Sequence, residues 1–464
     1  MKWTVILLPA LLSAQIVELG PAPRAPQPPS TKAITAERPA TNERSTWYDT
    51  SNRETVRQAY LNTFTSVSMG WTGAIAGCLP GATSSAWRNS AAARINWFRA
   101  MAGVPPVITL NDTYNTKDQQ AALMMSANRA LNHTPPSGWT CYTADGFDGA
   151  GNSNLCLSYN STPEPGCVSQ YIEDSGLNNY FVGHRRWVLH PQTQQMGTGD
   201  VEQTGSYPGS GYPYANALWV FDGHTFDARP AVRETGGFVA WPPRGYVPYQ
   251  KVFPRWSFAY PGANFAGATI TMNGSSTGVV KETLNNDAGY GENTLVWTWS
   301  GQPSGVPASD TTVTVTISGI TGAPQSSYTY QVIIFDPATS GGGGGTTAVT
   351  VTTNPTGRTF TVDGASYSSP QVFNWTPGSQ HTIATASPQS SGGTRYNFAN
   401  WSDAGPISHS ITTPASAATY TANFTTQYLL TTTVSPNGSG SISPSPSSAD
   451  GYYNAGAVVQ LTAS

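Results

Sequence analysis

The segment INWFRAMAGVPPVITLNDTYNTKDQQAALMMSANRALNH, residues 95–133, contains the two longest helical patterns of the chain. We expect helices over Ser90–Ala102 and Asp112–Leu131, the second capped by Asn111 or by Asp112 itself. Largely apolar side chains at spacings of three and four residues form one stripe of the second helix. This stripe consists of Ala121, Met124, Met125, Asn128 and Leu131, and the charges of Lys117 and Asp118 lie off it.

The sequence after this segment alternates short helical and apolar patterns. We expect a short helix over Val168–Asp174 and strands over Arg186–Leu189 and Leu218–Phe221. Helices that alternate with short strands predict a layered α+β or α/β domain. We place this domain, with an N-terminal extension, at residues 46–225.

The composition excludes several classes of protein. Charged residues make up 10% of the chain, where about 25% is usual. A net charge of -3 leaves no basic excess to neutralise phosphates, so we expect no nucleic-acid partner. A long coiled coil is excluded by the same shortage of charge, and 47 glycines with 36 prolines favour turns and strands.

The N-terminus has the pattern of an export signal. Lys2 precedes an apolar run over Trp3–Leu12, and the small residues Ser13 and Ala14 follow it. We predict a signal peptide at residues 1–14 and a Pro-rich spacer at 15–45. A buried N-terminal strand is the weaker alternative. No segment has the length of a transmembrane helix, so we expect a secreted or cell-surface protein.

The second half of the chain predicts β modules. Residues 246–337 contain alternating runs such as TVTVTIS (312–318), which indicate an all-β sandwich. A Gly-rich linker follows at 338–347. NPTG and TPGSQHTIATAS recur about 80 residues later as SPNG and NAGAVVQLTAS. We therefore predict one β repeat at 348–427 and a partial second copy at 428–464.

Four cysteines, Cys78, Cys141, Cys156 and Cys167, lie in one third of the chain. An exported protein meets an oxidising environment, so we expect two disulfides. The sequence allows three connectivities. We favour Cys156 with Cys167, which closes a short loop containing proline and glycine, and hence Cys78 with Cys141. Zinc binding is the weaker alternative because no CxxC pair exists.

Two histidines lie in segments with unusual local chemistry. His133 follows the long helix, and His184 follows a glycine in GHRRWVLHP. Glu173 and Asp174 are the carboxylates nearest in sequence to His184, and either one can orient an imidazole or complete a metal site. From the residues alone, each histidine is more often a hydrogen-bonded structural residue than a ligand or a base.

In their order along the chain, four motifs resemble the CAP superfamily of cysteine-rich secretory, antigen 5 and pathogenesis-related proteins, most closely its bacterial branch. The motifs are residues 95–133, GNSNL (151–155), VGHRRWVLHPQTQQMGTGDV (182–201) and ANALWVFDG (215–223). The resemblance implies a three-layer α-β-α sandwich with two histidines facing each other across a cleft. The β-rich segment from Trp241 to Pro337 resembles a domain that often follows bacterial CAP domains, and the terminal repeats resemble divergent internalin-type bacterial repeats.

The resemblance also implies a set of cleft residues. His133 and His184 correspond to the two cleft histidines. The family's GEN-type motif matches Gly151–Asn154 here without its glutamate, which leaves Ser153 and Asn154 beside the cleft. For the second family glutamate, Glu173 is the nearest candidate and Asp174 the weaker one. Two imidazoles and one carboxylate can hold a divalent metal such as zinc, more weakly than the complete family site.

These observations favour a binding protein over an enzyme. We expect a secreted or surface-displayed protein that binds a small molecule, lipid, peptide or metal in the His133/His184 cleft, without catalysis. Its β modules would be spacers or adhesive units that contact glycans or other surfaces. The alternative is a metal-dependent hydrolase or peptidase with His133 and His184 as ligands and Glu173 as ligand or base. A third possibility is a structural adhesin with a vestigial cleft.

Overall fold

The computed structural model describes residues 17–26, 47–159, 162–205, 211–283, 289–339, 347–375, 378–414 and 416–464. The chain divides into two compact units, Met1–Ser51 with Thr55–Thr339 and Asn52–Glu54 with Ser340–Ser464. The predicted signal peptide lies outside the described residues, as do most of the predicted spacer and of the Gly-rich linker. No helix in the described part is both long enough and apolar enough to cross a membrane.

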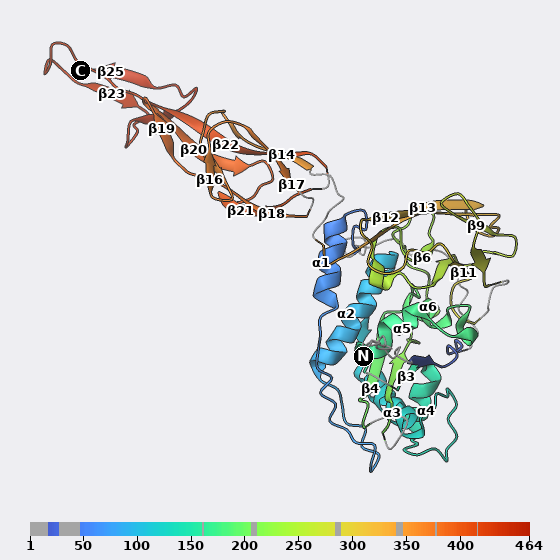
Figure 1. Cartoon of the computed structure of the whole chain (residues 1–464). Helices are drawn as coiled ribbons and strands as arrows, with labels where there is room; N and C mark the ends of the chain where they lie inside the picture. The colour runs from blue at the N-terminus through green and yellow to red at the C-terminus, as the bar shows by residue number, and fades with distance from the viewer. Residues whose placement is uncertain are drawn as a thin grey trace, which may run out of the picture. The chain divides into compact units, whose positions relative to one another are not determined.

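The helices all lie in the first half of the chain (Figure 1). They are α1 (Arg53–Thr63), α2 (Ser85–Ala102), α3 (Asp112–Asn128), α4 (Ala144–Asn152), α5 (Val168–Glu173) and α6 (Gly183–Val188). Both long helices are confirmed, and Asn111 caps α3 by accepting from the backbone N–H groups of Thr113 and Tyr114. The predicted strand over Arg186–Leu189 is wrong, because most of this run belongs to α6.

A five-stranded sheet lies among these helices in the order β1-β3-β5-β4-β2. Its strands are β1 (Val17–Leu19), β2 (Thr109–Leu110), β3 (Ser153–Ser158), β4 (Gln195–Val201) and β5 (Tyr214–Trp219). Neighbours pair antiparallel except β2 with β4, which pair parallel. The predicted mixed α+β class is confirmed. β1 falls within the range predicted as a spacer, and it forms one edge of the sheet.

Alternating side chains of this sheet belong to two different cores. Leu155 and Leu157 of β3 pack in one cluster with Met124 of α3 and Ala150 of α4. Cys156, between them in sequence, belongs to the other cluster, together with residues of α2, α5 and α6. This alternation follows from strand geometry, in which successive side chains point to opposite faces of the sheet. Helices therefore cover both faces of the sheet, and the segment around α5 and α6 lies on the face opposite to α3.

The next part of the first unit is all β. One four-stranded sheet has the order β10-β11-β8-β6 and the other β7-β13-β12-β9. Trp256 and Trp297 of the first sheet share one buried cluster with Val315 and Val332 of the second. The bounds are β6 Val239–Trp241, β7 Gly245–Pro248, β8 Arg255–Ala259, β9 Thr269–Met272, β10 Val279–Lys281, β11 Thr294–Trp299, β12 Thr311–Ser318 and β13 Ser327–Phe335. Because β6 pairs with β8, these sheets start ahead of the boundary predicted at residue 246.

Apart from the first residues of α1, the regular elements in the described part of the second unit are strands, packed around a core that includes Trp401 and Phe360. They are β14 Thr347–Asn354, β15 Phe360–Val362, β16 Ala365–Tyr367, β17 Gln371–Trp375, β18 Gln380–Thr385, β19 Gln389–Ser391, β20 Thr394–Trp401, β21 Ser408–Thr412, β22 Ala418–Leu429, β23 Ile442–Ser445, β24 Tyr452–Asn454 and β25 Gln460–Ala463. β22 crosses the boundary predicted at 427, and it pairs with β14 and β20 before it and with β24 after it.

Both predicted disulfides are present, Cys78 with Cys141 and Cys156 with Cys167. A buried arginine connects further segments of the first unit by hydrogen bonds. Arg99 of α2 has no exposed surface and donates to the backbone oxygens of Pro105, Val188, His190 and Thr193 at 2.8 to 3.0 Å. Burial lowers the pKa of this guanidinium to about 9. Arg99 thereby attaches the end of α6 and the loop after it to α2.

Candidate functional site

The carboxylate of Asp174 organises the start of α6. Asp174 ends α5 in the left-handed conformation, with φ 56°. Its Oδ1 accepts from His184 Nδ1 at 2.7 Å, and its Oδ2 accepts from the backbone N–H groups of His184 at 2.8 Å and Arg185 at 3.2 Å. Because a carboxylate only accepts, the Nδ1 of His184 carries the hydrogen and Nε2 presents a lone pair. This Nε2 is buried and has no hydrogen-bond partner in the described part of the chain.

The structure brings Asp174, and not the favoured candidate Glu173, to the imidazole of His184. Glu173 is the last residue of α5, and its backbone oxygen accepts from Arg185 Nη2 at 3.3 Å. Its side chain is half-buried. Burial raises the pKa of the Glu173 carboxyl, although Arg185, Arg255 and Lys251 act in the opposite direction.

Backbone oxygens lie at both ring nitrogens of His133. Its Nδ1 lies 2.7 Å from the backbone oxygen of Ala150, and its Nε2 lies 2.6 Å from that of Pro21. A neutral imidazole has a single N–H to donate. Burial lowers the pKa of His133, while the two carbonyl groups act in the opposite direction. His133 thus connects the end of α4 to the N-terminal segment.

Ser153 and Asn154 start β3 and have different partners. Ser153 donates from Oγ to Asp118 Oδ1 at 2.7 Å, and Asn154 donates from Nδ2 to the backbone oxygen of His184 at 3.3 Å. Asp118 of α3 is fully buried and also accepts from Trp219 N at 2.8 Å. Burial raises its pKa well above the usual range. The expectation that this charge lies off the buried stripe is wrong for Asp118, because β3 and β5 supply hydrogen-bond donors to it.

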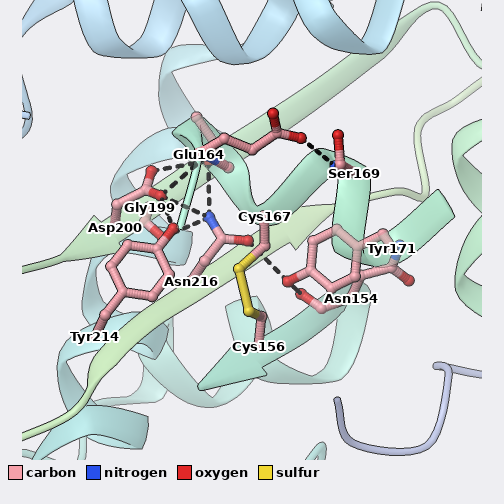
Figure 2. Close-up of a disulfide and its surroundings, with 12 residues drawn as sticks. Asn154, Cys156, Glu164, Cys167, Ser169, Tyr171, Gly199, Asp200, Tyr214 and Asn216 are labelled. Atoms are coloured by element: carbon pink, nitrogen blue, oxygen red, sulfur yellow. Dashed lines mark hydrogen bonds between the residues drawn. A yellow bond between two sulfur atoms is a disulfide. The ribbon is translucent and has the colours of Figure 1, made fainter. Parts of the chain in front are cut away.

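A hydrogen-bonded layer of polar side chains lies beneath this region, next to the Cys156–Cys167 disulfide (Figure 2). Asp200 Oδ1 accepts from Tyr214 Oη at 2.6 Å and from Asn216 Nδ2 at 3.1 Å. Tyr171 of α5 donates to Asn216 Oδ1 at 2.7 Å and stacks on the ring of His184 with centroids 5.6 Å apart. This network holds α5 and the stacked imidazole against the sheet.

Residues 17–25, which we term the N-terminal strap, lie across both histidine-bearing segments. β1 pairs with β3, and the chain continues from Gly20 to Ala25. The backbone oxygen of Pro21 lies at His133, and that of Pro23 accepts from Trp187 Nε1 at 2.8 Å. Ala22 between them is 4% exposed. It packs on Gly183, where an added Cβ would lie only 2.6 Å from the Cβ of Ala22.

The predicted zinc set of His133, His184 and Glu173 does not fit this arrangement. In the part of the chain that the structure describes, no three His, Cys, Asp or Glu side chains lie close enough together to hold one ion. Backbone oxygens lie against both nitrogens of His133. The chemistry that the arrangement does offer is contact with a peptide backbone, by the edge of β3 that β1 occupies and by N–H donors placed at carbonyl groups.

Sequence reasoning named Asp174 as a possible partner of His184 but ranked it below Glu173, and it missed two residues that shape this site: the donor Trp187 and the buried acceptor Asp118. Trp187 lies in the GHRRWVLHP segment. Its closeness in sequence to the cleft histidine His184 could have identified it as a residue of the site. Asp118 had no local signal, because its partners come from β3 and β5.

Comparison with known proteins supports one family. Residues 92–221 match the model of the CAP family, described as the cysteine-rich secretory protein family. No curated protein matches the chain. The matched range covers α3, α4, α5 and α6 together with β3, β4 and β5, and it contains both histidines. The order of the motifs, the paired disulfides and the match to this family agree, and the chain contains a CAP domain at residues 92–221.

Proposed function

We propose that the protein is secreted or displayed at the cell surface and that its CAP domain binds an extended peptide segment, without catalysis. The bound segment would take the place of β1 on β3 and cross His133 and α6. The β-rich domain and the terminal repeats would be spacers or adhesive units. Support for export comes from two disulfides, which oxidising compartments favour.

One observation carries the peptide proposal: the strap is held mainly through its backbone. Val17–Leu19 pairs with Cys156–Ser158 of β3. Beyond it, the side chains of His133 and Trp187 contact backbone oxygens of the strap. Strand addition with alternate side chains in pockets is a recurring mode of peptide recognition.

The prolines of the strap suit this mode. Proline lacks a backbone N–H, but its carbonyl oxygen still accepts hydrogen bonds. Pro21 and Pro23 use only that oxygen toward His133 and Trp187. Their rings also restrict the free peptide to extended conformations, so less conformational entropy is lost on binding. We therefore expect the favoured peptide class to be extended and to contain proline.

The alternative is a hydrolase that uses His184 as a base. The Asp174–His184 pair has the orientation that a general base needs, with Nε2 as acceptor. The imidazole has no exposed surface, however, and Ala22 of the strap packs on the preceding Gly183. Both functions require the strap to leave, but a strap-like peptide then restores the contacts of the strap, whereas hydrolysis needs His184 to stay open to a substrate.

The test uses a chain from which residues 1–26 are deleted and a fluorescein-labelled peptide, VELGPAPRAP, with the sequence of residues 17–26. We expect saturable binding by fluorescence anisotropy. Binding to the intact chain should be at least tenfold weaker, because the strap competes at an effective concentration in the millimolar range. Absence of binding to a deleted chain that melts cooperatively would contradict the proposal.

A matched pair of variants in the deleted chain tests the contact itself. Trp187→Phe keeps an aromatic ring in the core but removes the donor to the position of Pro23. We expect roughly fivefold weaker peptide binding from the loss of one hydrogen bond. Trp47→Phe is the control, because Trp47 belongs to the same unit and has no contact with the strap among those described. Equal affinities for the two variants would count against recognition of the backbone.

A further inference from the structure

A second site lies beyond the end of the strap, in a cavity of about 630 Å³. This volume falls in the range of about 300 to 1,000 Å³ that small-molecule sites occupy. The strap, the segment from α6 to Arg229 and three separate segments of the β-rich domain form its walls. The lining comprises Ala25, Trp187, His190, Gln192, Thr225, Phe226, Asp227, Arg229, Tyr260, Pro261, Gly262, Gly289, Gly291, Glu292, Asn293 and Gly322.

Two residues of the lining, His190 and Gln192, carry buried acceptor atoms without a partner in the described part of the chain. His190 Nε2 lies 3.0 Å from the backbone oxygen of Thr225, so Nε2 carries the hydrogen and Nδ1 presents its lone pair. His190 is 6% exposed, and its Nδ1 has no partner within the described ranges. The same holds for the buried amide oxygen Oε1 of Gln192. Buried acceptors without donors cost free energy, so a ligand that brings hydroxyl donors satisfies both.

The charged groups of the lining do not favour an ionic ligand. Arg229 donates from Nε and Nη2 to both carboxylate oxygens of Glu292, and both side chains are 8% exposed. The guanidinium is therefore already neutralised by its partner. Burial lowers the pKa of His190, which keeps its ring neutral at physiological pH.

Aromatic rings and glycines provide the remaining surface. Phe226 and Tyr260 contribute partly exposed apolar faces, and rings of this kind bury large apolar areas. An added Cβ at Gly262 or Gly289 would meet no atom within 4 Å, so a ligand can approach the backbone there. The site thus combines flat apolar faces with acceptors that require donors.

We propose that this cavity binds a neutral saccharide, whose ring C–H faces pack on Phe226 and Tyr260 and whose hydroxyl groups donate to His190 Nδ1 and Gln192 Oε1. A pyranose ring presents both an apolar face and a rim of hydroxyl donors. A purely apolar ligand would leave the two acceptors unsatisfied, and an anion would be repelled by them. This site is separate from the peptide contacts of the CAP domain, although Trp187 borders both.

The test titrates the full-length chain with cellobiose, maltose and N,N'-diacetylchitobiose, followed by saturation-transfer NMR and by calorimetry. We expect saturable binding of at least one of them. Gln192→Met should weaken it about tenfold by removing the acceptor at nearly constant volume, and Tyr260→Ala should do so by removing the stacking surface. Gln331→Met, on an exposed position of β13, is the matched control and should bind like the parent.

Three results would overturn the proposal. One is the absence of saturable binding for all three sugars. Another is equal affinity of the parent and both cavity variants, provided that circular dichroism shows the same melting behaviour for all of them. The third is displacement of a neutral apolar probe, N-phenyl-1-naphthylamine, by an alkyl alcohol but not by any of the sugars, which would assign the cavity to apolar ligands.

Discussion

His184 Nδ1 donates to Asp174 Oδ1 at 2.7 Å, and neither side chain has any exposed surface. The same carboxylate accepts two backbone N–H groups at the start of α6. Asp174 therefore does two things at once: it sets the hydrogen position on the imidazole, and it satisfies backbone donors that a helix start leaves without intrahelical partners. The orientation of His184 and the start of α6 depend on one side chain.

Replacement of Asp174 by asparagine should destabilise the first unit by about 2 to 3 kcal/mol, because an amide nitrogen would then face buried donors. Thermal or urea unfolding measures this change. Asp112→Asn, at an exposed position of the first turn of α3, is the control and should stay within about 0.5 kcal/mol. Equal effects at the two positions would show that the buried contacts of Asp174 contribute nothing.

The Glu173 carboxyl should make stability depend on pH. Its pKa is raised in the folded chain by burial. Its contribution is therefore fully present below about pH 4.3, the usual value for glutamate, and is lost as pH rises through the raised folded value. Glu173→Gln removes this titration. Between pH 4 and pH 7, the melting temperature of the variant should rise relative to that of the parent, and parallel curves would contradict the assignment.

Removal of the Cys156–Cys167 disulfide by a double alanine substitution should cost about 2 to 3 kcal/mol, as expected for a short closed loop. The loop carries Glu164, whose carboxylate accepts from Ser169 N at 2.6 Å at the start of α5. Hydrogen exchange of α5 should therefore rise more than that of α3. Uniform exchange over both helices would show that the disulfide stabilises the unit only globally.

The two units should unfold separately, because each has its own core. Trp401 is 1% exposed within the cluster of the second unit, and Trp97 is 1% exposed within a cluster of the first. Calorimetry should show that Trp401→Ala weakens only one transition, by about 3 to 5 kcal/mol, and that Trp97→Ala weakens the other by a similar amount. A single transition shifted by both variants would refute this independence.

Local patterns in the sequence were sufficient for much of the fold. The apolar stripe and the cap at Asn111 predicted α3, and the short spacing of Cys156 and Cys167 predicted their pairing. The strand expected over Arg186–Leu189 failed because an apolar run of four residues suits a strand and a buried helix equally. What favours the helix there is the carboxylate of Asp174, which accepts from the backbone at its start.

The site was only partly predictable. His133 and His184 were identified by their motifs, but their partners come from distant parts of the chain. The strap has no periodic pattern, and its proline content predicts a disordered or extended spacer. Its described residues are ordered by β3, His133 and Trp187, far away in sequence. Only tertiary contacts carry that information.

Arg99 and the residues that it contacts differ in how freely each can be replaced by another residue type. Its guanidinium donates only to main-chain oxygens, those of Pro105, Val188, His190 and Thr193 among them. A carbonyl oxygen is present whatever side chain the residue bears, so these contacts set no requirement on the residue types of their partners. Arginine at position 99 cannot be replaced by lysine. Lysine has its three donors on one nitrogen, so it cannot reach acceptors that lie around different nitrogens of the guanidinium. Substitutions in the loop that borders both proposed sites should therefore leave its backbone course in place as long as Arg99 is kept.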